Sequence, residues 1–588
     1  MANWMVAAKK ADFEAWANEF HISPVTARLV RNRGVVSMEE AAKFLHDDAG
    51  HDAYGLKDVV TAASELLKCR EEQGRVRIIG DYDVDGICSS YILKAGLTFA
   101  GFLVDVVLPE RIRDGYGLNT NLVADAFADD IALILTCDNG IAAHDAVLSA
   151  REKGMKILVT DHHEVQKDEA GNDILPQADA VVNPKRSDCS YPFEGICGAV
   201  VAYKLLEVLF AEDVKEGNAP YGAEASKRCL KSLQPFTALA TVCDVMELVD
   251  ENRGIVRRGL LEMATTTNHG LKALINVTGL DAAGISAYHL GFVLGPCLNA
   301  SGRLDTAKRA LSLFEATSEA HAVQIATDLK ELNDSRKEMT AKATEEATAL
   351  AQNLLKEQPA LKILVLYLPD CHESIAGIVA GRIREKFFRP VIVLTDALGE
   401  EGEVKMVKGS GRSIESYHMF EGLSKCADLF VKFGGHKMAA GMTLAQKDVA
   451  ALTNRLNASC NLTEDDFTET LHIDMELPLS YMTLPLVEEF SCLEPFGNGN
   501  PKPLFVTRDL TLEKGVRIGR DASMGRFSVR DDQGKMHTLM RFSDVEELFS
   551  MLEEKPPVTI NAVYEANRNV YRGETSVQFI LRDYKRKP

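Results

Sequence analysis

Three short apolar runs in the first part of the chain each lead directly into acidic residues. The runs and the segments that follow them are Val76–Ile79 with Gly80-Asp81-Tyr82-Asp83-Val84-Asp85-Gly86, Ile131–Thr136 with Cys137-Asp138-Asn139-Gly140, and Ile157–Thr160 with Asp161-His162-His163. Short apolar strands separated by helical stretches predict βαβ units and a parallel sheet. Because ligands of such sheets bind at the carboxyl ends of the strands, we expect the acidic segments to form one site.

The acidic segments contain the ligand types of a metal centre. Alternating carboxylates on the extended segment Asp81–Asp85 point the same way, and Asp244, in the apolar stretch Leu239–Val245, is a fourth candidate. Crowded carboxylates repel one another unless cations neutralise them, and carboxylates mixed with imidazole suit Mn²⁺ and tolerate Mg²⁺. The ligands suffice for two ions, which at a separation of about 3.5–4 Å can activate a water and stabilise the leaving oxygen of a phosphodiester.

The alternative for each of these aspartates is a helix N-cap with no metal. That alternative explains one aspartate at one strand end. It does not explain why the three strand-end segments and Asp244 all carry acidic residues, so the pattern favours the metal centre.

Composition restricts the class of protein. The 588 residues are 46% hydrophobic and 26% charged, which predicts a globular chain of two to four domains. No apolar run reaches the ~20 residues of a membrane span, and the first twenty residues do not resemble a signal peptide. The twelve cysteines form no C-x-x-C pair, which argues against a zinc ribbon or a thioredoxin-like site and fits free thiols in a reducing cytoplasm.

Charge is unevenly distributed along the chain. The net charge is −20, yet residues 493–588 carry 16 Lys and Arg against 14 Asp and Glu, a balance of +2, which leaves −22 for the remainder. A locally basic surface on an acidic protein can still bind a phosphate backbone. Ordinary scatter of charge is the alternative, and the sequence leaves both open.

The pattern divides the chain into five parts. Residues 317–358 contain no Gly or Pro and are rich in Ala, Glu, Lys and Leu, which predicts one or two long helices that link two domains. After a second α/β region, short β-like runs alternate with Gly and Asn turns and indicate a small β-barrel. The expected parts are a helical, polar segment 1–74, a parallel-sheet domain 75–316, a linker helix 317–358, a second α/β domain 359–456 and a barrel 466–588.

Two glycine-rich segments of the second α/β region have the composition of phosphate-binding loops. In Gly409-Ser410-Gly411-Arg412-Ser413 the glycines expose backbone N–H groups and the arginine offers a bidentate fork. Gly434-Gly435-His436 has a similar composition. The alternative for each segment is a glycine-rich turn without a ligand.

The motifs, taken in order, resemble those of the DHH/DHHA1 phosphoesterases, and among them the RecJ single-stranded-DNA-specific exonucleases. The four acidic segments are similar to motifs I to IV. Further segments resemble other RecJ elements: Leu108–Leu118, Asn183–Leu205, Leu294–Ala307, His372–Gly441 and Leu493–Phe505. The resemblance implies an α/β fold in which a DHH parallel-sheet domain and a DHHA1 α/β domain are joined by a long helix and followed by a C-terminal oligonucleotide-binding (OB-type) β-barrel.

The resemblance also implies roles for single residues. Direct metal ligands would be Asp83, Asp85, Asp138, His162 and Asp244. Residues that orient ligands or contact phosphate, and so complete the catalytic set, would be Asp81, Asp161 and His163. The expected substrate-binding residues are Arg111, Arg303, Ser410, Arg412, Ser413, Gly435 and His436. Phe505, Phe527 and Phe579 are candidates for stacking on bases, with burial in a core as the alternative.

The implied activity is metal-dependent hydrolysis of single-stranded DNA from 5′ to 3′, in DNA repair and recombination. The polarity rests on the resemblance alone. The nearest alternative is a DHH-family phosphodiesterase that acts on short oligoribonucleotides or cyclic dinucleotides, against which the long C-terminal region argues. A catalytically inactive replication scaffold is a third candidate, against which the intact motifs argue. The expected partner is single-stranded DNA; a single-strand-binding protein and a helicase are further candidates, and no membrane is expected.

Overall fold

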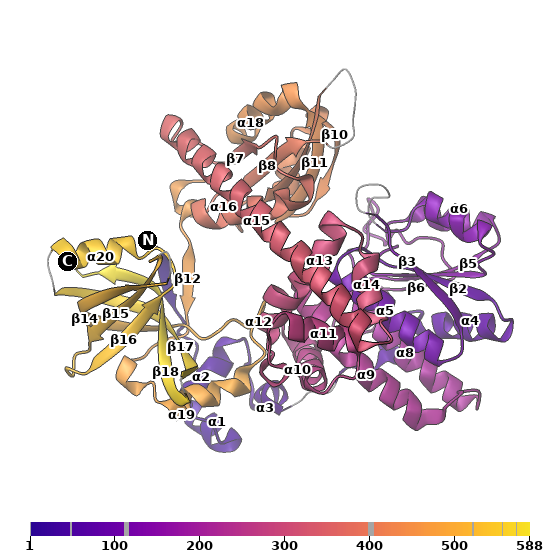
Figure 1. Ribbon diagram of the computed structural model, residues 1–588, viewed down its shortest axis with the longest axis horizontal. Helices are drawn as coiled ribbons and strands as arrows, with labels where there is room; N and C mark the ends of the chain where they lie inside the picture. The colour runs from indigo at the N-terminus through magenta and orange to yellow at the C-terminus, as the bar shows by residue number, and fades with distance from the viewer. Residues whose placement is uncertain are drawn as a thin grey trace.

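The computed structural model describes residues 2–46, 50–110, 117–397, 405–519, 522–554, 557–571 and 573–587. Figure 1 shows three domains: a parallel-sheet domain, a mixed-sheet domain and a barrel. The long helix α15 (Glu319–Glu357) runs from the first domain to the second. Within the described residues, no helix combines the length and the hydropathy that a membrane crossing requires.

The parallel-sheet domain contains five strands in the order β3-β2-β4-β5-β6, all parallel. The strands are β2 (Arg75–Ile79), β3 (Leu103–Val107), β4 (Leu133–Cys137), β5 (Lys156–Thr160) and β6 (Ala180–Val182). The chain passes from β2 to β3 on one side and then to β4 on the other. The direction of the strand order therefore reverses between β2 and β4, and such a reversal opens a ligand crevice at the carboxyl ends of the strands.

Helices cover both faces of this sheet because successive strand residues point to opposite faces. Ile78, Leu135 and Leu158 contribute to the larger core, whereas Ile134 and Ile157 contribute to the core on the other face. The larger core includes α4 (Val59–Glu71), α5 (Val84–Phe99), α8 (Gly198–Lys215), α9 (Gly222–Cys243), α10 (Asp250–Ala264), α11 (His269–Val277) and α14 (Lys308–Phe314). The other includes α6 (Thr120–Ala128) and α7 (His144–Glu152). The short helices α12 (Ala287–His289) and α13 (Gly295–Leu304) follow α11.

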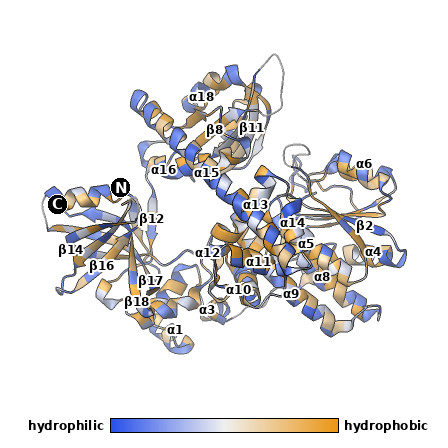
Figure 2. Cartoon of the chain, in the orientation of Figure 1, coloured by the Kyte–Doolittle hydropathy of each residue, from blue (hydrophilic) through white to orange (hydrophobic). Residues whose placement is uncertain are grey.

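The helix α15 belongs to two cores. Its first turns, around Ala322–Leu329, pack in the larger core of the parallel-sheet domain, and its last turns, around Ala343–Ala351, pack in the mixed-sheet domain. Figure 2 shows much hydrophilic colour along α15, and the buried residues between its two ends, Asn333 and Thr340, are polar. The expectation of a long linking helix within 317–358 is confirmed.

The mixed-sheet domain contains five strands in the order β10-β11-β9-β8-β7. The strands are β7 (Leu364–Tyr367), β8 (Val391–Asp396), β9 (Met406–Arg412), β10 (Phe430–Gly435) and β11 (Ala439–Ala445); the helices are α16 (Glu373–Phe387), α17 (Met419–Ser424) and α18 (Val449–Ala458). Only β7 and β8 are parallel, and the pairs from β8 to β10 are antiparallel.

The C-terminal sheet closes on itself as a barrel, because β14 pairs with both β15 and β17. Its members are β13 (Met475–Glu476), β14 (Phe505–Ile518), β15 (Met524–Arg530), β16 (Met536–Arg541), β17 (Val558–Tyr571) and β18 (Glu574–Arg586), with helices α19 (Leu484–Glu489) and α20 (Glu546–Glu554). The predicted fold class, with two α/β domains, a linking helix and an OB-type barrel, is therefore confirmed.

The N-terminal segment contributes to the core of the barrel. Helices α1 (Phe13–Phe20), α2 (Pro24–Asn32) and α3 (Met38–His46) supply Trp16, Leu29 and Leu45, respectively, to the core that also contains Phe505. The segment was expected to be helical, but it opens with the strand β1 (Asn3–Val6), which pairs in parallel with β12 (Thr470–Ile473).

Buried contacts attach the barrel to the parallel-sheet domain. Arg253 of α10 is 3% exposed and donates hydrogen bonds to the carbonyls of Leu493 and Cys492, at 2.7 Å each, and of Phe44, at 3.1 Å. The Leu248 amide donates to the Asn498 carbonyl at 2.7 Å. The stretch of chain that follows Asp244 is thus tied to the segment that leads into the barrel.

Candidate active site

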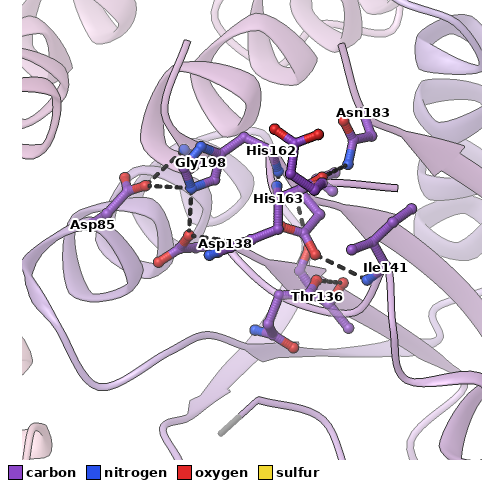
Figure 3. A network of polar contacts seen from close by, with 12 residues as sticks. Asp85, Thr136, Asp138, Ile141, His162, His163, Asn183 and Gly198 are labelled. Atoms are coloured by element: carbon purple, nitrogen blue, oxygen red, sulfur yellow. Dashed lines mark hydrogen bonds and ion pairs between the residues drawn. The ribbon is translucent and has the colours of Figure 1, made fainter. Parts of the chain in front are cut away.

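The first acidic segment lies at the N-terminus of α5, beyond the end of β2. Asp83 is the N-cap of α5, and its Oδ1 accepts hydrogen bonds from the amides of Asp85 and Gly86 at 3.0 and 3.1 Å. Asp85 is buried, and its two carboxylate oxygens accept from the amides of Gly198 and Ala199 at 2.7 and 2.8 Å. The N-terminus of α8 therefore holds Asp85 in place, as Figure 3 shows.

The second segment places Asp138 at the end of β4 in a left-handed conformation, with φ of 60°. Asn139 fixes this turn because its side-chain amide donates to the carbonyls of Ile79 and Cys137, at 3.0 and 2.9 Å. Gly140 has φ of 114°, and a Cβ there would lie 2.6 Å from Thr136 Oγ1. The turn thus links the ends of β2 and β4 where the strand order reverses.

The third segment contains two histidines with different surroundings. Asp161 is buried and accepts from the Ile141 amide at 2.9 Å and from His163 Nδ1 at 2.7 Å. His162 Nε2 lies 3.0 Å from Asp138 Oδ1, 3.5 Å from Asp85 Oδ2 and 3.6 Å from Asp244 Oδ2. Figure 3 shows His162 directed toward Asp85 and Asp138, with His163 beside it.

All eight predicted metal-binding and catalytic residues come together at this edge of the sheet. Three overlapping groups each have ligand atoms within 4.8 Å of one another: Asp138, His162 and His163; Asp85, His162 and Asp244; and Asp81, Asp83 and Asp138. Asp138 and His162 each belong to two groups. Shared ligands at this spacing are the arrangement that adjacent cations require.

Electrostatics favour occupation of these groups by cations. Burial and the charges of Asp85 and Asp83 hold the pKa of Asp138 well above its ordinary range. Burial and the same two carboxylates raise the pKa of Asp244 to about 8. A carboxyl group that resists ionisation beside other carboxyl groups gains stability when a metal ion replaces its proton.

The two histidines differ in charge. Burial lowers the pKa of His162, which favours the neutral ring that a metal requires. Burial also acts to lower the pKa of His163, but the hydrogen bond and charge of Asp161 outweigh it and raise the pKa to about 9. Asp161 therefore keeps His163 protonated near neutral pH.

The donor set fits Mn²⁺ or Mg²⁺. Within the described residues, His162 Nδ1 is buried and has no hydrogen-bond partner, although most buried ring nitrogens have one. The other ring nitrogen of His162, Nε2, faces the carboxylates of Asp85, Asp138 and Asp244. A neutral imidazole among carboxylates is a ligand set for Mn²⁺, and Mg²⁺ accepts the carboxylate part of it.

A cavity of about 740 Å³ adjoins the histidines. Its walls come from both α/β domains, because Asp161, His162, His163 and Lys185 line it together with His436 from the mixed-sheet domain. The expected substrate-binding residue His436 is thus placed over the centre. Gly435, its neighbour, has φ of 152° and lies where a Cβ would meet the Ala439 carbonyl at 2.4 Å, so it shapes this turn.

A second cavity of about 320 Å³ brings together Arg303, Ser410 and Arg412. Arg303 Nη1 donates to the Ser374 carbonyl at 2.5 Å, and Arg412 Nη1 donates to Ser410 Oγ at 3.2 Å. Ser413 lies outside this cavity: it is 1% exposed and its hydroxyl donates to the Tyr417 carbonyl at 2.8 Å. Arg111 falls outside the described residues.

Three residues of the site were not predicted from the sequence. A Cβ on Gly198 would lie 2.7 Å from Asp138 Cβ, so only glycine allows α8 to approach the centre. A Cβ on Gly377 would lie 2.9 Å from Arg412 Nη2. Asn139 joins two strand ends. The sequence does show a glycine, Gly198, at the start of an apolar helical run. It could not show that this glycine contacts Asp138, because Asp138 is distant in sequence.

Family comparisons match all three domains. The DHH family N-terminal domain matches residues 75–233, the DHHA1 domain matches 360–461 and the RecJ OB domain matches 473–583. The chain is 33% identical to the single-stranded-DNA-specific exonuclease RecJ of Bacillus subtilis (strain 168), over 96% of this chain and 68% of that protein. It is 35% identical to the RecJ protein of Dickeya dadantii (strain 3937), over 94% of each.

Solved structures agree with these matches. The crystal structure of RecJ in complex with Mn²⁺ from Thermus thermophilus has a TM-score of 0.80 and 26% identity, and the match covers 100% of this chain and 80% of that chain. A crystal structure of exonuclease RecJ bound to manganese has a TM-score of 0.57 and 29% identity, over 70% of this chain and 96% of that chain. With all four motifs gathered in one centre and relatives similar along nearly the whole length, the chain belongs to the RecJ family.

Proposed function

We propose that this chain is an exonuclease that depends on Mn²⁺ or Mg²⁺ and hydrolyses phosphodiester bonds of single-stranded DNA from 5′ to 3′, in DNA repair and recombination. The observation that carries the proposal is the position of the carboxylate–histidine centre. It lies at the wall of a cavity that a second domain closes with His436, in a chain of the RecJ family.

The proposed ligands of two ions are Asp83, Asp85, Asp138, His162 and Asp244. Asp138 and His162 belong to two groups each, which makes them the residues best placed to serve both ions. When bound, the ions would supply an activated water and charge stabilisation for the leaving oxygen. The amides of Gly198 and Ala199 keep Asp85 oriented toward His162.

The other acidic and basic groups position the substrate. Asp161 accepts a hydrogen bond from Nδ1 of His163 and favours the protonated ring, whose positive charge can attract a phosphate of the substrate. His163 lines the cavity and its side chain is 42% exposed, so a substrate can reach it. We assign Asp161 to positioning, and His163 and Asp81 to the substrate side of the centre.

The cavity around Arg303, Ser410 and Arg412 is proposed to bind the phosphate at the strand end. It joins an arginine of the parallel-sheet domain to the glycine-rich strand β9. Lys408 also lines it and forms an ion pair with Glu373 at 3.3 Å, so the two arginines carry its net positive charge. A guanidinium beside hydroxyl and amide donors is suited to a phosphate. The proposed 5′ to 3′ polarity requires a 5′ phosphate to bind here. Arg111 and Gly435 are the other proposed contacts with the strand, and Ser413, buried outside this cavity, acts on it only through the segment that follows β9.

The alternative, a phosphodiesterase specific for short oligoribonucleotides or cyclic dinucleotides, needs only the two α/β domains. The barrel argues against it, since the barrel is a RecJ OB domain and the 493–588 region has a charge balance of +2 in a chain of −20. Oligonucleotide-binding barrels hold single strands through backbone contacts and stacking.

The proposal extends to the setting of the enzyme. All twelve cysteines are free thiols, which fits a reducing cytoplasm. Single-stranded DNA in cells is produced and covered by other proteins, so a helicase and a single-strand-binding protein are the proposed protein partners.

Digestion of labelled oligonucleotides tests the proposal. Single-stranded and duplex DNA of several lengths, short RNA and a cyclic dinucleotide are incubated with the protein, with Mn²⁺ and with a chelator. We expect hydrolysis of single-stranded DNA only with metal and slow or no attack on blunt duplex. Efficient hydrolysis of the cyclic dinucleotide without activity on long strands would support the alternative instead.

A further inference from the structure

Two aromatic side chains are exposed and stacked on each other on the parallel-sheet domain. Tyr288 and Phe292 are 59% and 71% exposed, and their ring centroids lie 5.0 Å apart with an angle of 22° between the planes. Phe292 is the most exposed phenylalanine or tyrosine among the described residues. Leu261, 70% exposed, lines the same cavity as Tyr288. Contiguous exposed apolar side chains mark a binding surface more often than scattered ones do.

The pair is held next to the proposed metal ligand Asp244. Phe292 lies in a π-helical turn, η3 (Leu290–Leu294); such turns are rare and frequently occur at functional sites. Cys243 Sγ lies 3.5 Å from the Leu290 carbonyl, and a Cβ on Gly291 would lie 3.3 Å from Val242 Cγ1. The turn therefore packs on the last turn of α9, immediately before Asp244.

The pair also adjoins the segment that leads into the barrel. A cavity of about 380 Å³ is lined by Tyr288 and Leu261 on one side and by Phe496 and Lys502 on the other. Asn498 donates to the Val245 carbonyl at 2.8 Å, so this segment touches the residue after Asp244. Figure 1 shows α12, which contains Tyr288, on the side of the parallel-sheet domain that faces the barrel. This surface is therefore bounded by the segment that leads into the barrel and by the turn that contains Asp244 and Val245.

The chemistry of the surface suits unpaired bases with their phosphates. The outer face of the stacked pair presents a π-face to a base. In the adjoining cavity, Arg257 and Lys502 supply positive charge for the backbone, against one acidic residue, Glu494. The three barrel phenylalanines expected to be candidates for stacking are buried: Phe505 and Phe527 are 0% exposed and Phe579 is 7% exposed. Tyr481 and Phe542 of the same region are 64% and 49% exposed, less than Phe292.

We propose that Tyr288 and Phe292 form a base-stacking platform that holds unpaired bases of single-stranded DNA between the barrel and the metal centre. The inference rests on the proposed function and assigns it a subsite. Stacking on the exposed rings lets the strand pass in single-stranded form without sequence preference, because every base has a π-face.

A double-mutant cycle between base and ring tests the platform. Binding of a single strand is measured in the Asp138→Ala background, which prevents digestion, with one abasic position moved stepwise from the 5′ end. In the Asp138→Ala protein, an abasic site at one or two adjacent positions should weaken binding about 5- to 150-fold relative to the intact strand. In the protein that also carries Tyr288→Ala and Phe292→Ala, the same abasic sites should have no further effect.

Two controls separate stacking from other causes. Phe292→Tyr keeps a ring and should retain the positional effect. Tyr221→Ala removes another exposed aromatic residue, 67% exposed and packed on Phe99 at the far end of α9, and should change nothing. Equal sensitivity to abasic sites with and without the two rings would overturn the platform and leave this surface to a protein partner. Absence of any single-strand binding or digestion by the unaltered protein would instead overturn the proposed function.

Discussion

At the scale of single residues, the centre depends on how closely α8 approaches β4. Gly198 donates its amide to Asp85 at 2.7 Å, and its missing side chain leaves room for Asp138. One residue thus positions two proposed ligands. The requirement comes from a contact between segments sixty residues apart in sequence, and this is why the strand-end pattern predicted the carboxylates without predicting the glycine.

Gly198→Ala should therefore reduce activity more than stability. The added methyl group would displace Asp138 and lengthen the Asp85 hydrogen bond, so we expect kcat to fall at least about 10-fold and manganese affinity to weaken. Gly381→Ala in α16, where a Cβ meets no atom within 4 Å, is the matched control. Unchanged manganese affinity and kcat in Gly198→Ala would show that this approach is unimportant.

Asp138→Ala should abolish hydrolysis and leave the fold intact. Asp138 belongs to two ligand groups, and water cannot replace a carboxylate that sets the spacing of two ions. We expect a loss of activity of at least about 100-fold, with unchanged circular dichroism. The exposed Asp125→Ala serves as control. Activity near that of the unaltered protein would mean that the metal centre is wrongly assigned.

The sequence pattern predicted that these acidic and histidine residues would lie together, because most of them directly follow strands of a parallel sheet. Asp83 shows that the two interpretations weighed for these residues are compatible, since it caps α5 and also belongs to a ligand group. The roles of all eight residues, as metal ligands or as groups that contact the substrate, remain predictions, because they depend on bound ions and a bound strand.

At the scale of elements, the proposed end-phosphate site, the cavity around Arg303, Ser410 and Arg412, is lined by the two domains that α15 connects. Arg303 lies at the end of α13, next to α15, and Arg412 lies at the end of β9. A Cβ on Gly377 of α16 would lie 2.9 Å from Arg412 Nη2. The arginine is therefore confined between α16 and the strand.

Arg412→Ala should weaken the grip on a 5′-phosphorylated end more than on a 5′-hydroxyl end. The lost guanidinium removes a charge-assisted contact, so we expect KM for the phosphorylated strand to rise about 10-fold and KM for the hydroxyl strand to change less. Arg382→Ala, an exposed arginine of the same domain, is the control. Equal losses on both substrates would exclude Arg412 as the reader of the end phosphate.

Elements with local patterns were predicted, and elements with distant partners were not. The absence of Gly and Pro in 317–358 predicted α15, which spans Glu319–Glu357. The strand β1 has no local pattern that marks it, because its partner β12 lies more than 460 residues away. The exact domain boundaries remain predictions for the same reason, since α1 to α3 and α4 pack in different cores.

At the scale of the whole molecule, the N-terminal helices and the barrel form one unit. Removal of the C-terminal region alone would expose Trp16 and Leu29, which share a core with Phe505. The barrel is best removed together with residues 1–49, which leaves 50–461. This shortened chain keeps the proposed metal ligands and both α/β domains.

The shortened chain should hydrolyse dinucleotides and trinucleotides but bind long strands poorly. Each lost phosphate contact reduces the salt dependence of binding by about 0.7 on a logarithmic scale, so the remaining binding should depend less on salt. Affinity for long and short strands is measured over a range of salt concentrations on protein shown to be monodisperse. Affinity and salt dependence equal to those of the full chain would exclude the barrel as a DNA-binding module.

The account as a whole is tested most directly by digestion of a single strand labelled at one end or the other. With Mn²⁺, we predict that a 5′ label is released at once in small products, while a 3′ label stays on a strand that shortens with time. A chelator or Asp138→Ala should stop both. Early release of the 3′ label, internal cleavage that produces both labels in long fragments, or digestion that continues without metal would contradict the account.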